Sequence, residues 1–242
     1  TDLDIGFGSS NKASLGTADI FFVLGATKAT KKVYKVANCC VNEASLEFDI
    51  DGIATIAWSG MGTIITDETS APAATITEGT GVNDTGNFIR NRLTSLSLTT
   101  GMGGNHPATY DLVLTGGSVT ISNNMTFLTP ETLGVVNQPL GHVTGSRSVS
   151  GSFTCYLNSE DDSSAELFEN IIEDQSTITN DFTLLFKVGG TSSPRMEVNL
   201  ATCHLEVPSH SIDDVISLET NFHALPSTIE GTDEITLKYV GA

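Results

Sequence analysis

The sequence is poor in positive charge and in aromatic residues, and it contains no long apolar run. Lys and Arg number 11 against 29 Asp and Glu, so the 242-residue chain has a formal net charge of −18 at pH 7. Such a surface repels nucleic acid and anionic membranes, although acids that only keep a protein soluble would give the same charge. No stretch approaches the roughly 18 consecutive apolar residues of a membrane-spanning helix. The composition thus predicts a protein that neither crosses a membrane nor binds nucleic acid tightly.

The sequence also lacks the patterns that usually mark catalytic and metal sites. It has no nucleophile elbow, no Walker A loop and no dinucleotide fingerprint. Asp49-x-Asp51-Gly52 begins like a calcium loop, but its twelfth position is Gly60, where that loop needs Glu. The five histidines show no metal-ligand spacing; they are His106, His142, His204, His210 and His223. We therefore predict no enzyme activity, no cofactor and no metal.

The four cysteines do not stand in C-x-x-C spacing, which argues against zinc and thioredoxin-type sites. Cys39 and Cys40 are adjacent, so on a strand their side chains point to opposite faces. Cys155 and Cys203 fall on apolar strand faces, where a buried reduced thiol is usual. Two interpretations stay open: four structural thiols, or a disulfide among these residues, including one that joins two chains.

Alternation of apolar and polar residues predicts that the chain is mainly β-structure. Leu46, Phe48 and Ile50 alternate with three acids, Glu47, Asp49 and Asp51. This pattern indicates a half-buried strand with one acidic face.

A second alternating segment covers 148–157, and its polar face carries Ser148, Ser150 and Ser152. Segment 109–121 is expected to form a hairpin that turns at Gly116–Gly117. In segment 196–207 the apolar positions change parity, which predicts a β-bulge.

One amphipathic helix is expected at about 162–174. Ser163 and Glu166 have the spacing of a capping box. Leu167, Phe168, Ile171 and Ile172 form one apolar stripe on an otherwise acidic segment. A lone helix among strands is expected to cover a sheet or to close one end of a barrel.

The chain is expected to form an N-terminal arm (1–18) and a single β domain (19–242). Two long loops, 60–87 and 101–108, interrupt the domain, and a loop as long as the first is usually functional. The few basic residues gather in one short segment, as Lys28, Lys31, Lys32 and Lys35. This segment is either a docking surface for another acidic copy or a solvated face.

Several blocks of the chain together resemble bacteriophage tail tube proteins. The first is L-E-F-D-I-D-G-I-A-T-I-A-W-S-G-M-G at 46–62. The second begins with S-V-S-G-S-F-T-C-Y-L at 148–157 and continues, after the helix, with F-T-L-L-F-K-V and M-E-V-N-L-A-T-C-H-L-E-V-P. The last runs from S-I-D-D-V-I-S-L-E-T-N-F-H-A-L-P-S to D-E-I-T-L-K-Y-V-G at 211–241.

The resemblance implies a β-sandwich or half-barrel with one flanking helix. In that family six subunits form a ring, and their inner sheets join into one inter-subunit β-barrel around a channel. Stacked rings form a tube along a tape-measure protein, and double-stranded DNA passes through it without specific binding. The implied place is the virion tail, assembled in the host cytoplasm. A contractile tail with a surrounding sheath protein is slightly favoured over a non-contractile one.

The same resemblance suggests which residues face the channel and which face other subunits. Candidate channel residues are Glu47, Asp49, Asp51, Ser148, Ser150 and Ser152, and the alternative is that these faces meet the outer solvent. Loop 60–87 is the candidate arm toward a neighbouring subunit, and the lysine segment is its electrostatic partner. The candidate contact residues are Lys28, Lys31, Lys32, Lys35, Asp67, Glu68 and Glu78.

Two other functions compete with a phage tail tube. A tube of a type VI secretion or pyocin-like contractile system would share the fold and lack genome transport. A β-sandwich that binds carbohydrate, or an adhesin, would be expected to show exposed aromatic platforms. A single Trp and 7% aromatic residues speak against this last function.

Overall fold

The computed structural model of the chain describes residues 3–5, 16–24, 32–68, 89–101, 106–128, 141–173, 182–212, 215–229 and 231–241. The first strands are β1 (Leu3–Ile5), β2 (Ala18–Leu24), β3 (Lys32–Phe48), β4 (Thr55–Met61), β5 (Ile64–Glu68), β6 (Ser95–Thr100), β7 (Thr109–Asp111) and β8 (Leu114–Ser122). The later strands are β9 (Thr126–Leu128), β10 (Gly141–Val143), β11 (Ser148–Tyr156), β12 (Phe182–Val188), β13 (Arg195–Leu205), β14 (Ser209–Ile212), β15 (Ile216–Ala224) and β16 (Thr236–Val240). The helices are α2 (Ser164–Glu173) and the 3₁₀ turn η1 (Asn91–Leu93).

Nearly all described strands belong to one antiparallel sheet, and the described residues contain one short α-helix, which confirms the prediction of a mainly β fold. The main path of the sheet is β2-β3-β8-β11-β15-β13-β12-β6-β7. Strands β4 and β5 pair with β3, β14 pairs with β15, and β16 pairs with both β13 and β1. Strands β9 and β10 form a separate hairpin. Within the described residues the path has two ends, so one chain does not close into a barrel.

The sheet curves around a core of aromatic side chains. Phe48 of β3 lies 5.3 Å from Phe186 of β12 between ring centroids, and Phe186 lies 5.9 Å from Phe222 of β15. Four strands separate β3 from β12 along the sheet. Because their rings nevertheless touch, the sheet must fold back over its own apolar face. The side chains of Phe153, Phe186 and Phe222 are fully buried in this core.

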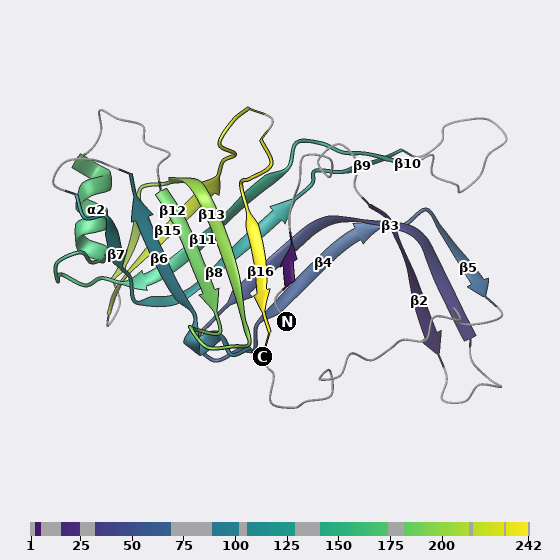
Figure 1. The fold of residues 1–242 in the computed structure, drawn as a ribbon, viewed down its shortest axis with the longest axis horizontal. Helices are drawn as coiled ribbons and strands as arrows, with labels where there is room; N and C mark the ends of the chain where they lie inside the picture. Colours follow the sequence, from purple (N-terminus) through teal and green to yellow (C-terminus); the bar gives the residue numbers. More distant parts are fainter. Residues whose placement is uncertain are drawn as a thin grey trace.

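Strand β3 is unusually long and serves two parts of the molecule. Its first half pairs with β2 and β5, and its second half pairs with β4 and β8. Asn38 has φ of 50° where the two halves meet, a conformation that Asn tolerates better than most residues. Figure 1 shows β2, β5 and the first half of β3 projecting from the main body, with α2 at the opposite end. We call this three-stranded part the projecting sheet.

The helix lies where the sequence predicts it, but its start differs. Leu167 is buried, while Ile172 at the edge of the stripe is 37% exposed. The capping box does not form as expected: the Glu166 carboxylate accepts from the Asp162 backbone N–H at 2.7 Å. The Ser163 hydroxyl instead donates to the Asn158 carbonyl at 2.6 Å. The side-chain amide of Asn170 donates to the buried Tyr110 hydroxyl at 2.8 Å, which ties α2 to β7.

Two expectations about strands need correction, and one is confirmed. Gly116–Gly117 is not a hairpin turn but part of β8, because Gly117 lies opposite Phe153 of β11 and Phe48 of β3. The loop expected from residue 60 begins later, since β4 continues to Met61 and β5 covers Ile64–Glu68. The predicted bulge is confirmed, because the register of β12 against β13 shifts between Phe182 and Leu184.

Part of the predicted N-terminal arm is also strand, since β1 pairs with β16. No helix within the described residues is long and apolar enough to cross a membrane.

Candidate functional site

A continuous polar face extends over five neighbouring strands of the sheet. Side chains that lie directly opposite each other on paired strands share a face, so the register gives the rows. One row runs across the sheet through Thr55, Glu47, Ser118, Ser152 and Asn221. The next runs through Ala57, Ser45, Thr120, Ser150 and His223. A third contains Ser59, Glu43, Ser122 and Ser148. We call this surface the polar face.

The polar face contains most of the predicted channel residues. Glu47, Ser148, Ser150 and Ser152 all belong to its rows, although they come from strands 100 residues apart in the chain. The opposite side of the same strands is the core, where Val149 and Phe153 are 2% and 0% exposed. The alternation predicted for both segments therefore correctly separates the polar side chains from the buried ones.

β3 ends at Phe48, so Asp49 and Asp51 lie beyond the strand that was predicted to include them. The Asp49 carboxylate accepts from the backbone N–H of Gly52 at 2.6 Å, which makes a tight turn beyond the strand. Both acids are exposed at the end of the polar face. Ile50, expected to continue the apolar side of the strand, is 44% exposed for the same reason.

The polar face is acidic and has no lysine or arginine. None occurs in 41–48 of β3 or in β4, β8, β11 and β15, all of which lie within the described residues. Its acids include Glu43, Glu47 and Glu219, and hydroxyl side chains fill the middle strands. Glu43 and Glu219 are not among the sequence-predicted residues, although each stands at a polar position of an alternating segment.

A cluster of titratable groups lies at the β13–β15 end of the polar face. His204 of β13 is directly opposite His223 of β15. The Nε2 atom of His223 lies 3.4 Å from Oε1 of Glu206. The Asn221 amide donates to Oε2 of Glu206 at 2.9 Å. The Asn221 hydrogen bond, with the nearby His223 and His204, holds the pKa of the Glu206 carboxyl below its ordinary value.

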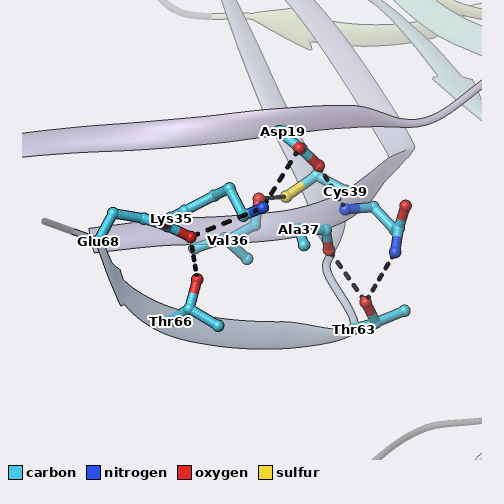
Figure 2. A network of polar contacts seen from close by, with 9 residues as sticks. Asp19, Lys35, Val36, Ala37, Cys39, Thr63, Thr66 and Glu68 are labelled. Carbon is cyan, nitrogen blue, oxygen red and sulfur yellow. Dashed lines mark hydrogen bonds and ion pairs between the residues drawn. The ribbon is translucent and has the colours of Figure 1, made fainter. Parts of the chain in front are cut away.

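The projecting sheet brings together the predicted basic and acidic contact residues within one chain. Lys32 of β3 pairs with Asp67 of β5 at 3.1 Å, and this contact raises the pKa of Lys32. Lys35 lies 3.7 Å from both Asp19 and Glu68. Figure 2 shows Lys35 between these two carboxylates, with Thr66 donating to Glu68 at 2.8 Å. Lys28, Lys31 and Glu78 lie outside the described residues.

One face of the projecting sheet is exposed and mostly apolar, with the Lys32–Asp67 pair at one end of it. Its members alternate along β2, β3 and β5 and lie opposite one another in the register. They include Ile20 (47% exposed), Phe22 (52%), Leu24 (57%), Tyr34 (36%) and Ile65 (70%). Isolated apolar side chains are normal on a protein surface, but a contiguous group of this kind marks an interaction surface.

The four cysteines are free in this structure. Cys155 and Cys203 lie in the core, and burial raises the pKa of their thiols to about 11 and about 12. Cys40 is also buried, 3.6 Å from Nε2 of His142, whereas Cys39 is only half-buried. A disulfide between chains therefore remains a hypothesis, and Cys39 is the candidate for it because the other three cysteines are buried.

Two comparisons with known proteins bear on these surfaces. The family model described as phage tail tube protein matches residues 6–230. The chain is also 32% identical, over 206 residues, to the tail tube protein pb6 of Escherichia phage T5. That alignment covers 82% of this chain and 44% of the T5 protein, so the chain spans less than half the length of this relative.

Proposed function

The chain belongs to the phage tail tube protein family, a family of structural rather than enzymatic proteins, and we propose that its copies assemble into stacked hexameric rings around a channel for DNA. It is thus a component of the virion tail, as the sequence resemblance implies. We further propose that the rings assemble in the host cytoplasm and that each subunit is a half-barrel. The chain would then divide into an arm (1–18) and one domain (19–242).

The main observation that supports the proposal is the polar face. It combines carboxylates with small hydroxyl groups and lacks lysine and arginine in the strands that form it. A wall of this kind repels the phosphates of DNA and offers them no cation to bind. We infer that this face lines the channel, with Glu47, Ser148, Ser150 and Ser152 on the wall and Asp49 and Asp51 at its end.

If the sheets of neighbouring subunits join, the strand edges that are unpaired in one chain become paired. Among the described strands β4 pairs only with β3, and β7 ends the main path. Exposed edges are prone to uncontrolled pairing, and closure into a barrel removes them. Six curved sheets joined edge to edge would give a barrel that one chain does not close.

The projecting sheet is the proposed contact with a neighbouring copy. Its exposed apolar face would be buried there, since a tube subunit is surrounded by copies of itself. The lysine segment with Asp67, Glu68 and Glu78 would surround this contact. Because Lys32 and Asp67 already pair within one chain, we expect these charges to orient the contact and the apolar side chains to supply most of its free energy.

A tape-measure protein is the expected partner during assembly, by analogy with the family. The comparisons name a tail tube and give no support to the preference for a contractile tail, so a sheath protein is not part of the proposal. The same two comparisons disfavour a carbohydrate-binding or adhesin module. A secretion or pyocin-like tube remains the second candidate because it would share the fold.

The channel assignment is tested by neutralising the acids at one end of the polar face. Phage carrying Glu47→Gln, Asp49→Asn and Asp51→Asn should eject DNA more slowly at low ionic strength, because the wall repels phosphates less, and high salt should reduce the difference. A matched control neutralises three exposed acids near α2, with Glu160→Gln, Asp161→Asn and Glu173→Gln. Unchanged ejection by the first variant at every salt concentration would contradict the assignment.

A further inference from the structure

Two edge strands of the main sheet contain no Asp, Glu, Lys or Arg. The strands that pair with only one other described strand are β1, β2, β4, β5, β7 and β14. Acids stand in four of them, as Asp4 in β1, Asp19 in β2, Asp67 and Glu68 in β5, and Asp111 in β7. Strands β4 (T-I-A-W-S-G-M) and β14 (S-H-S-I) have neither a charged residue of these types nor a proline. Because charges and proline protect an edge from pairing, β4 and β14 are the two edges left open to it.

These two strands also lie at opposite borders of the polar face. Strand β4 pairs with β3 at one border, and β14 pairs with the first half of β15 at the other. Each strand from β4 through β3, β8, β11 and β15 to β14 is antiparallel to the next, so β4 and β14 run in opposite directions. In a ring whose copies all have the same orientation, β14 of one copy would therefore lie antiparallel to β4 of the next.

The side chains of the two edges face compatible directions. Ser211 of β14 lies opposite Ser217 of β15 and extends the polar face, so the next residue, Ile212, points to the other side of the sheet. On β4, Ala57 belongs to the polar face and Trp58 points to the other side. A polar wall that continues from one copy into the next would thus place Ile212 on the same side as Trp58.

Trp58 lines an apolar groove that is incompletely covered in one chain. Every side chain that lines this groove is apolar, and Leu46, Ile121 and Leu237 are among them. Trp58 itself is 60% exposed, and Ile212 is 76% exposed. If β14 of a neighbouring copy is added to β4, these two large apolar side chains leave water together, which favours the contact.

We propose that β14 of one copy pairs antiparallel with β4 of the next copy, and that Ile212 packs against Trp58 behind the polar face. This inference rests on the ring of the proposed function and names the two strands that join its subunits. The contact is head-to-tail, as a closed ring requires. Its backbone hydrogen bonds are those of a strand added to a sheet edge. Because neither strand carries an acid, two copies with a net charge of −18 each meet here without like charges in contact.

Cysteine cross-linking in assembled tubes tests the strand pair. Ser211→Cys is combined in turn with Thr55→Cys, Ala57→Cys and Ser59→Cys, so that three positions along β4 are sampled. Cys39→Ser removes the native thiol that is only half-buried. After oxidation, at least one combination should give a ladder of covalent oligomers, up to the size of the ring, on a non-reducing gel.

Ser45→Cys with Ser211→Cys is the matched control. Ser45 lies opposite Ala57 but one strand further from the edge, where the two Cα atoms would be too far apart for a disulfide. Tubes in which no β4 combination cross-links more than this control would overturn the inference and leave the proposed ring standing. A wild-type chain that forms no rings would overturn both.

The fluorescence of Trp58 gives a second readout, because it is the single tryptophan of the chain. Its emission maximum should shift to shorter wavelength on assembly, since the indole leaves water, and Ile212→Ser should reduce that shift. Ile229→Ser is the control, because Ile229 is 96% exposed and belongs to no strand. An equal shift in the wild type and in assembled Ile212→Ser would show that Ile212 does not cover Trp58 and would overturn the inference.

Discussion

Cys155 and Cys203 are the residues whose titration should couple most strongly to folding. Both are buried, and burial raises the pKa of the two thiols from 9.0 to about 11 and about 12. The folded chain therefore keeps two protons that the unfolded chain releases above about pH 9. The stabilising contribution is complete below that pH and is lost as the pH rises through 11 to 12.

We predict that the free energy of unfolding falls between about pH 9 and 11, by up to about 1.4 kcal/mol per pH unit for each thiol. Urea unfolding at several pH values measures this. The Cys155→Ala/Cys203→Ala variant should be less stable throughout but should lose stability less steeply with pH. Parallel curves for the two proteins would contradict the prediction. As a second readout, only Cys39 should react readily with Ellman's reagent in the folded wild type.

Strand β8 depends on a glycine for its place between β3 and β11. A Cβ atom on Gly117 would lie 2.6 Å from the carbonyl oxygen of Ser152 and 2.8 Å from the ring of Phe48. A Cβ atom on the preceding Gly116 would meet only the Phe48 carbonyl oxygen, at 3.5 Å, which is an ordinary contact. The two neighbouring glycines thus have different roles in the same strand.

Gly117→Ala should destabilise the chain by about 1–3 kcal/mol, because β8 must shift away from β11 or Phe48 must move. Gly116→Ala should change the free energy of unfolding by no more than about 0.5 kcal/mol. Urea denaturation of both variants makes the comparison. Equal effects would mean that the packing of β8 does not limit stability.

The sequence predicts elements well where one local pattern decides them. The alternation of residues 148–156 and the apolar stripe of α2 were sufficient to locate both elements. Sequence patterns fail where packing decides the structure: Gly116–Gly117 looks like a turn, but Gly117 lies within a strand and makes room for the ring of Phe48. The contact between His223 and Glu206 was missed because the two residues are far apart in the sequence and meet only through the pairing of β13 with β15.

The apolar face of the projecting sheet should matter for assembly and not for the fold of one chain. Phe22 is 52% exposed, so Phe22→Ser should leave the unfolding curve of the single chain nearly unchanged. If a neighbouring copy buries this side chain, its loss costs about 1.5–3 kcal/mol per contact. The concentration needed for assembly should then rise by about tenfold or more, as sedimentation would measure.

Ile229→Ser is the control for that experiment, because Ile229 is 96% exposed and lies outside the projecting sheet. It should leave assembly unchanged. A Phe22→Ser variant that assembles at the wild-type concentration would show that the apolar face is not an interface between copies.

At the scale of the whole molecule, the distribution of charge and apolar surface suits a subunit surrounded by copies of itself. The net charge of −18 opposes association at long range, so contacts between copies must come from buried apolar surface and strand pairing. The projecting sheet has exposed apolar surface at one end of the molecule (Figure 1), and in the proposed ring the strand edges would supply the pairing. The polar face would then be left for the proposed channel, which solvent would fill.

Electron microscopy of the purified chain over a series of rising concentrations is the first test of whether its copies form rings and tubes. We predict rings with a central hole that stack into tubes of constant diameter. Single particles without a central hole at every concentration, up to the solubility limit, would contradict it.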